Sequence, residues 1–132
     1  MKDKDSINLF TESKVTIHNL IKQGCMVSIV TSNSRQLVEA VLKSYDIRTS
    51  YIVADISLTG KTKELKKLVI ESGVGQTFTI YIGDEVRDIQ AAKKARVKSG
   101  AVSWGYAHLD KLALSDPDFI FKKFSDILRL ND

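Results

Sequence analysis

Two aspartates four residues apart, Asp84 and Asp88, could do chemistry in this sequence. They lie in the stretch YIGDEVRDIQAAKKA, residues 81–95, where a hydrophobic run ends at Gly83 and an Ala- and Lys-rich helical pattern begins. Two carboxylates at the junction of a strand and a helix suit Mg²⁺, which prefers carboxylates combined with water and phosphate oxygens. The alternative is structural, because Asp84 could cap the helix and Asp88 could complement its dipole. The spacing alone leaves both interpretations open.

Two other segments could bind a phosphate group. The apolar run VSIVT, residues 27–31, ends in Thr31 and is followed by Ser32, so hydroxyls and free backbone N–H groups would lie near a helix start, where anions bind. Lys61 follows a glycine and precedes a helical pattern, and could bring a positive charge to the phosphate. The alternatives are simple caps and a solvated lysine. The segment is not a P-loop, since that motif requires glycine where this chain has Asp55.

The elements that must position these residues alternate between helix and strand. Apolar residues spaced by three and four predict helices, and short β-branched runs predict buried strands. Three of the expected helices cover about residues 11–23, 62–72 and 123–130. Another follows an N-cap at Ser34 and ends at Tyr45, and another runs from the aspartate pair to about residue 97. A short helix is expected between the last two strands. The expected strands cover residues 27–31, 51–54, 77–82, 99–103 and 118–121.

This alternation predicts an α/β fold. Parallel strands need crossover connections, and helices are the usual crossover, so we expect a three-layer, Rossmann-like parallel sheet with helices on both faces. In such sheets ligands bind beyond the carboxyl ends of the strands. Thr31, Ser32 and Asp84 follow predicted strands directly and should therefore lie at that edge.

Length and composition predict one ordinary globular domain, residues 1–132, with 43% hydrophobic and 27% charged residues. The net charge of +4 is spread along the chain, which favours solvated helix faces over a nucleic-acid interface. Cys25 is the only cysteine, so no intrachain disulfide can form. No apolar run approaches the roughly 20 residues of a membrane span. We therefore expect a cytoplasmic protein that binds neither membrane nor nucleic acid.

Three segments, taken in order, resemble the haloacid dehalogenase (HAD) superfamily in its phosphoglycolate phosphatase-like branch. IVTSNS resembles the second family motif, GKTKEL the third, and YIGDEVRDIQAAKKARV the fourth, and the similarity spans about residues 9–130. The resemblance implies Mg²⁺-dependent hydrolysis of a small phosphate monoester through an aspartyl-phosphate. By resemblance, Thr31 and Ser32 would bind the phosphoryl group and Lys61 would stabilise its charge. Asp84 would be a metal ligand, and Asp88 would support the metal site.

Two parts of the family pattern are not found in this sequence. The family nucleophile lies in a DxDG[TS] motif after a central strand, whereas the only DxD that precedes the three segments here, Asp3-Lys4-Asp5, follows just two residues and is interpreted as chance similarity. The cap domain of this branch is not found either. We therefore expect a phosphatase core that is truncated and impaired alone. The alternatives are a non-catalytic module that binds phosphate, metal or a partner chain, and an enzyme whose partner supplies the aspartate.

The missing central strand has a structural consequence. In the family it lies between the strands that correspond to residues 27–31 and 77–82, and unpaired strand edges invite a partner. We expect either direct pairing of these two strands or dimerisation across the gap.

Overall fold

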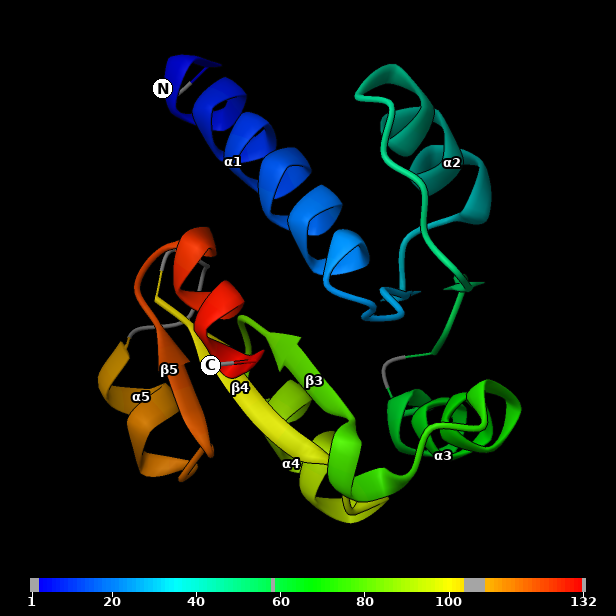
Figure 1. Ribbon diagram of the computed structural model, residues 1–132. Coiled ribbons are helices and arrows are strands. Elements are labelled where there is room, and N and C mark those ends of the chain that lie inside the picture. The colour runs from blue at the N-terminus through cyan, green and yellow to red at the C-terminus, as the bar shows by residue number, and fades with distance from the viewer. Residues whose placement is uncertain (1–2, 58, 104–108, 132) are drawn as a thin grey trace. The chain divides into compact units, whose positions relative to one another are not determined.

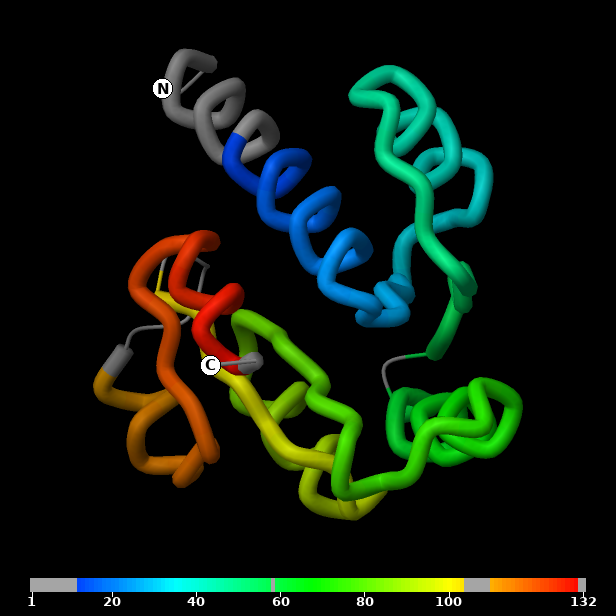
Figure 2. The backbone as a smooth tube through the Cα atoms, in the orientation of Figure 1, coloured from blue at the N-terminus to red at the C-terminus, as the bar shows by residue number. Residues whose placement is uncertain are grey.

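The computed structural model describes residues 3–57, 59–103 and 109–131, which form two compact units (Figures 1 and 2). The first unit comprises Met1–Ile56 and Phe124–Asp132, and the second comprises Ser57–Lys123. The first contains α1 (Asp3–Lys22), β1 (Ile29–Val30), α2 (Arg35–Ser44), β2 (Ile52–Val53) and the 3₁₀ segment η2 (Phe124–Asn131). The second contains α3 (Lys61–Ser72), the 3₁₀ turn η1 (Gln76–Phe78), β3 (Ile80–Gly83), α4 (Val86–Ala95), β4 (Lys98–Val102), α5 (Leu109–Leu114) and β5 (Phe119–Phe121).

The first unit holds a short parallel ladder, in which Ile29 of β1 lies opposite Ile52 of β2. Ser34 caps α2 as predicted, because its hydroxyl accepts a hydrogen bond from the Leu37 N–H at 3.2 Å. Helix α1 packs against η2. Among the described residues, no helix is both long and apolar enough to cross a lipid bilayer.

The second unit holds a three-stranded parallel sheet in the order β3-β4-β5. Helix α4 lies against β3 and β4, and α3 packs against α4 (Figure 1). Because β4 has a partner on both sides, its residues after Lys98 are buried. Ile89, Ala101 and Leu112 form the centre of this core. This packing fixes α3 and α4, the two helices that carry Lys61 and Asp88.

Gly100, in β4, lies close to side chains of both neighbouring strands. A Cβ at this position would lie 2.7 Å from Cε2 of Phe121 and 3.2 Å from Cγ1 of Ile82. Overpacking of this kind typically costs about 1–3 kcal/mol. We expect Gly100→Ala to lower the free energy of unfolding by that amount in urea denaturation. Gly75→Ala is the matched control, because its Cβ would meet its nearest atom at 3.8 Å; equal effects of the two substitutions would contradict the prediction.

The α/β class with parallel strands is confirmed, since all three ladders are parallel. The direct pairing of residues 27–31 with 77–82 is not observed. The described strands form two sheets, in which β1 pairs only with β2 and β3 only with β4. With two residues, β1 offers few backbone groups for a second ladder. A single chain does not test the alternative expectation, dimerisation.

Three elements differ most clearly from the predictions in type or starting residue. The run TFTIYI was expected to be a strand from residue 77, but its start forms η1, because the N–H groups of Phe78 and Thr79 donate to carbonyls three residues earlier. The last predicted helix is the 3₁₀ segment η2. Helix α1 begins at Asp3 rather than near residue 11, which places the Asp3-Lys4-Asp5 sequence in a helix and not after a strand. This placement agrees with its interpretation as chance similarity.

Candidate active site

Asp84 and Asp88 flank the start of α4, at the carboxyl end of β3. The N-cap of α4 is Glu85, not Asp84, so the structural alternative in which Asp84 caps the helix is wrong. Asp88 does take part in capping. Its Oδ2 accepts a hydrogen bond from the Glu85 N–H at 3.1 Å, as one half of a capping box. Asp84 therefore needs another explanation than capping.

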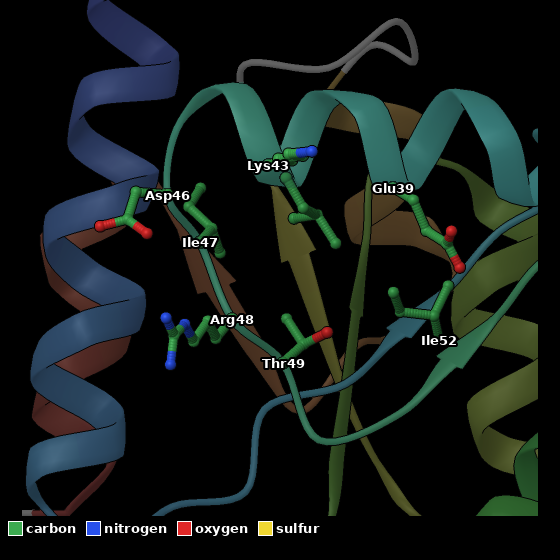
Figure 3. Close-up of a pocket in the computed structure, with 8 residues that line it drawn as sticks. Glu39, Lys43, Asp46, Ile47, Arg48, Thr49 and Ile52 are labelled. Carbon is green, nitrogen blue, oxygen red and sulfur yellow. The ribbon is translucent and has the colours of Figure 1, made fainter.

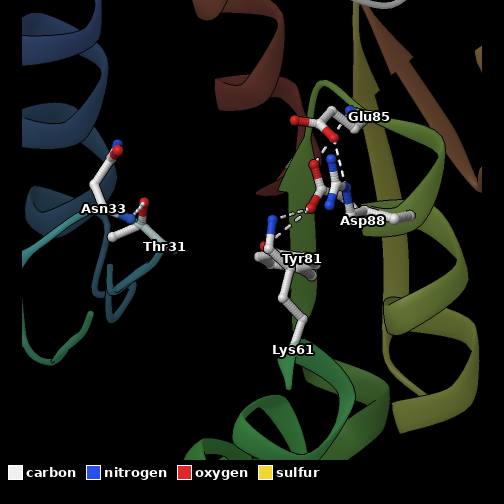
Figure 4. A network of polar contacts seen from close by, with 7 residues as sticks. Thr31, Asn33, Lys61, Tyr81, Glu85 and Asp88 are labelled. Atoms are coloured by element: carbon white, nitrogen blue, oxygen red, sulfur yellow. Dashed lines mark hydrogen bonds and ion pairs between the residues drawn. The ribbon is translucent and has the colours of Figure 1, made fainter. Parts of the chain in front are cut away.

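Lys61 and Asp88 meet in a buried ion pair. Lys61 is the first residue of α3, and its Nζ lies 2.5 Å from Oδ1 of Asp88 (Figure 4). The two side chains are only 14% and 4% exposed. They are 27 residues apart in sequence and are brought together by the packing of α3 on α4. Two residues that the sequence singled out separately are thus in direct contact.

Tyr81 is a third member of this cluster, and the sequence analysis missed it. Its hydroxyl donates to Oδ1 of Asp88 at 3.4 Å (Figure 4). Burial, and then the negative charge and hydrogen bond of Asp88, raise the pKa of Tyr81 above its ordinary value. The phenol therefore stays protonated and remains a donor. Residues two apart on a strand face the same side of the sheet, so Tyr81 lies on the same face as Gly83. This spacing was the signal in the sequence that could have identified Tyr81 as a member of the cluster.

Gly83 leaves the space that the Asp88 carboxylate occupies. A Cβ on Gly83 would overlap Oδ2, Cβ and Cγ of Asp88. Glycine is therefore required here for the close approach of α4 to the end of β3. The strand end and the helix start fit together only around this glycine.

Asp84 is half-buried and differs from Asp88 in its contacts. Within the described part of the chain, no hydrogen bond or ion pair engages its carboxylate, whereas three donors engage that of Asp88. The described residues contain no cluster of three or more His, Cys, Asp or Glu side chains that could enclose a metal ion. An ion bound at Asp84 would therefore complete its shell largely with water or substrate oxygens, which is the coordination that Mg²⁺ prefers. The donors present fit this metal.

Thr31 and Ser32 lie in the first unit, directly after β1. Thr31 Oγ1 accepts a hydrogen bond from the Asn33 N–H at 3.1 Å (Figure 4), and Ser32 is exposed. The Thr31 N–H donates to the Val53 carbonyl at 2.9 Å, because it continues the ladder between the strands. The expectation of free backbone N–H groups is therefore wrong for Thr31. Its hydroxyl can still donate to a ligand.

The first unit also contains a cavity of about 480 Å³, and none of the predicted site residues lines it (Figure 3). It lies between α2 and the start of β2, and one wall carries Thr49, whose buried hydroxyl has no hydrogen-bond partner among the described residues. Its lining is Glu39, Leu42, Lys43, Asp46, Ile47, Arg48, Thr49 and Ile52. Both acidic and basic side chains border it, so it does not favour a phosphate.

Comparison with known proteins identifies the family of the chain. Residues 1–102 match the family of haloacid dehalogenase-like hydrolases. The chain is 30% identical over 126 residues to the phosphoglycolate phosphatase of Synechococcus elongatus, an alignment that covers 94% of this chain and 59% of that protein. The crystal structure of a predicted phosphoglycolate phosphatase from Haemophilus somnus 129PT superposes with a TM-score of 0.81 at 27% identity, over 90% of this chain and 55% of that one.

A more distant structure shares the fold. It is the 3-deoxy-D-manno-octulosonate 8-phosphate phosphatase of Moraxella catarrhalis in complex with a magnesium ion, a phosphate ion and KDO, with a TM-score of 0.64 at 23% identity over 86% of this chain and 60% of that one. The chain thus spans little more than half the length of the relatives it matches. The family match covers most of the chain, and the fold and motifs agree with it. The chain belongs to the haloacid dehalogenase-like hydrolases.

Proposed function

We propose that residues 1–132 are a core domain of a Mg²⁺-dependent phosphatase that hydrolyses a small phosphate monoester of the phosphoglycolate type. The observation that carries the proposal is the contrast at the end of β3. Asp88 is fully engaged and holds Lys61, while the neighbouring carboxylate of Asp84 is unengaged within the described part of the chain. A held cation beside a carboxylate available for a metal suits the binding of a phosphate dianion.

Each residue has a separate task in this proposal. Asp84 holds Mg²⁺, which when bound neutralises charge on the phosphoryl oxygens. Lys61 donates hydrogen bonds to the phosphoryl group and stabilises its negative charge. Asp88 keeps the Lys61 ammonium group in place. By resemblance alone, Thr31 and Ser32 of the first unit would bind a phosphoryl group through their hydroxyls. Phosphoryl transfer depends mainly on such positioning and charge stabilisation, so these groups suit the reaction even though none of them is a nucleophile.

The attacking aspartate of the family is not identified among these residues. We propose that a second polypeptide, or a further part of a longer protein, supplies it together with the strand that carries it. Among the described strands, β3 pairs on one side only, so its other edge has backbone groups available for an added strand. A second copy of the chain is one candidate for this partner.

A non-catalytic module is the second candidate function. It is favoured by the placement of Asp3 and Asp5 in α1, since neither follows a strand as the family nucleophile does. Such a module would bind Mg²⁺ or phosphate without turnover. Measurement of binding and hydrolysis on the same preparation separates the two functions.

Asp84→Asn tests the metal site shared by both candidates. We expect this substitution to weaken Mg²⁺ binding by at least about tenfold, measured by isothermal titration calorimetry. Loss of a residue that only supports a metal ligand already weakens binding by about this factor, so loss of a ligand should weaken it at least as much. Asp110→Asn is the control, since Asp110 is an exposed acid on α5. Equal Mg²⁺ affinity in the wild type and Asp84→Asn would contradict the assignment.

Hydrolysis of p-nitrophenyl phosphate with Mg²⁺ distinguishes the functions. Turnover that persists in Asp3→Asn but is lost in Asp84→Asn would support a phosphatase with a nucleophile outside the Asp3 segment. Mg²⁺ binding without turnover, even after mixing with candidate partner chains, would favour the module. Turnover lost in Asp3→Asn would show that the DxD sequence is functional and overturn its interpretation as chance similarity.

A further inference from the structure

We infer that Tyr81 is a positioning residue, whose hydroxyl orients the Asp88 carboxylate and, through it, the ammonium group of Lys61. Oδ1 of Asp88 accepts from two side chains, Lys61 Nζ at 2.5 Å and the Tyr81 hydroxyl at 3.4 Å. Oδ2 accepts from the Glu85 N–H at 3.1 Å. The donors come from three places: the start of α3, the strand β3 and the N-cap of α4. The value of this arrangement for phosphate chemistry rests on the proposed function.

The local structure gives the phenol a fixed place. Tyr81 lies inside β3, where its backbone pairs with Ser99 of β4. Strand alternation puts its side chain on the same face as Gly83, the face on which Asp88 lies. A strand residue with both neighbours in a ladder has little freedom to move. Tyr81 is therefore a rigid donor, in contrast to a lysine on a long flexible side chain.

The hydroxyl group makes the difference, rather than the aromatic ring. Phenylalanine would fill the same space between β3 and α4 but would donate no hydrogen bond. Lys61 alone would then hold Oδ1, so the carboxylate could turn about its bond to Cβ until only the contact of Oδ2 with the Glu85 N–H restrained it. The ammonium group would follow the turning carboxylate. Small displacements of a positioning group have large effects on phosphoryl transfer, so the second donor matters.

Tyr81→Phe tests this inference through the Lys61 ammonium group, observed by ¹⁵N NMR. We expect its N–H protons to exchange with water about fivefold faster in Tyr81→Phe, the effect of losing one ordinary hydrogen bond from the cluster. Tyr51→Phe, which removes a tyrosine hydroxyl from the other unit, should leave the Lys61 exchange rate unchanged. A crystal structure of Tyr81→Phe should show a rotated Asp88 carboxylate.

The opposite results are equally definite. An unchanged Lys61 exchange rate and an unrotated Asp88 in Tyr81→Phe would overturn the inference, as would equal acceleration in Tyr51→Phe. Mg²⁺ binding in the same samples distinguishes this failure from failure of the proposed function. The inference fails alone if the Lys61 exchange rate is unaffected while Asp84→Asn still weakens Mg²⁺ binding. The proposed function fails alone if Tyr81→Phe accelerates the Lys61 exchange but neither the wild type nor any variant binds Mg²⁺.

Discussion

Asp88→Ala should lower the free energy of unfolding by about 3–5 kcal/mol, the typical cost of removing one partner from a buried ion pair. The Asp88 side chain is 4% exposed, and its loss would leave the Lys61 ammonium, itself 14% exposed, without its carboxylate. The Glu85 N–H and the Tyr81 hydroxyl would lose their acceptor as well. Urea denaturation followed by circular dichroism measures the difference.

Two comparisons give this result its meaning. The double variant Lys61→Met/Asp88→Leu removes both charges, and should recover much of the lost stability because no buried charge is left alone. Arg87→Ala breaks the neighbouring pair with Glu85, whose side chains are 43% and 37% exposed, and should cost less than about 1 kcal/mol. If Asp88→Ala lowers the free energy of unfolding no more than Arg87→Ala does, the Lys61–Asp88 pair does not stabilise the fold as a buried ion pair. The proposal that Asp88 positions Lys61 would then be wrong.

The junction around Asp84 and Asp88 was predictable because it depends on local sequence. A β-branched run that ends in glycine, followed by acids and an Ala-rich pattern, specifies a strand, a turn and a helix within one segment. The structure places β3 and α4 there. The N-cap is one residue later than the spacing suggested, since Glu85 occupies the N-cap position in an extended conformation. The error is small because the cap is chosen by backbone geometry that several polar residues can satisfy.

Contacts between distant segments were harder to predict. Lys61 and Asp88 were each selected for their place after a strand, but their pairing depends on the packing of α3 against α4, which no local pattern contains. Tyr81 was missed because an aromatic residue in an apolar run is usually a core residue. The predicted pairing of residues 27–31 with 77–82 was wrong for the same reason. The pairing of strands that are distant in sequence is set by tertiary structure and not by a local pattern. The roles of Thr31, Ser32, Lys61, Asp84 and Asp88 in catalysis stay predictions.

Gly83→Ala should have the second large effect, because it adds an atom where the structure has no room. The new Cβ would overlap Oδ2, Cβ and Cγ of Asp88, so either the strand end or the first turn of α4 must move. We expect a loss of about 3 kcal/mol in the free energy of unfolding, the upper part of the overpacking range. Gly75→Ala, whose Cβ has ordinary contacts, should be nearly neutral in the same urea titration.

A double-mutant cycle shows whether Gly83 acts through Asp88. Two of the three overlapped atoms, Oδ2 and Cγ, are absent in Asp88→Ala. Gly83→Ala should therefore cost much less in the Asp88→Ala background than in the wild type, and the two effects should fall short of additivity by at least about 1 kcal/mol, as is usual for residues in direct contact. Strictly additive losses would mean that the methyl group disturbs β3 by another route. Coupling, in contrast, would show that the glycine at the end of β3 is there to admit the carboxylate that holds Lys61.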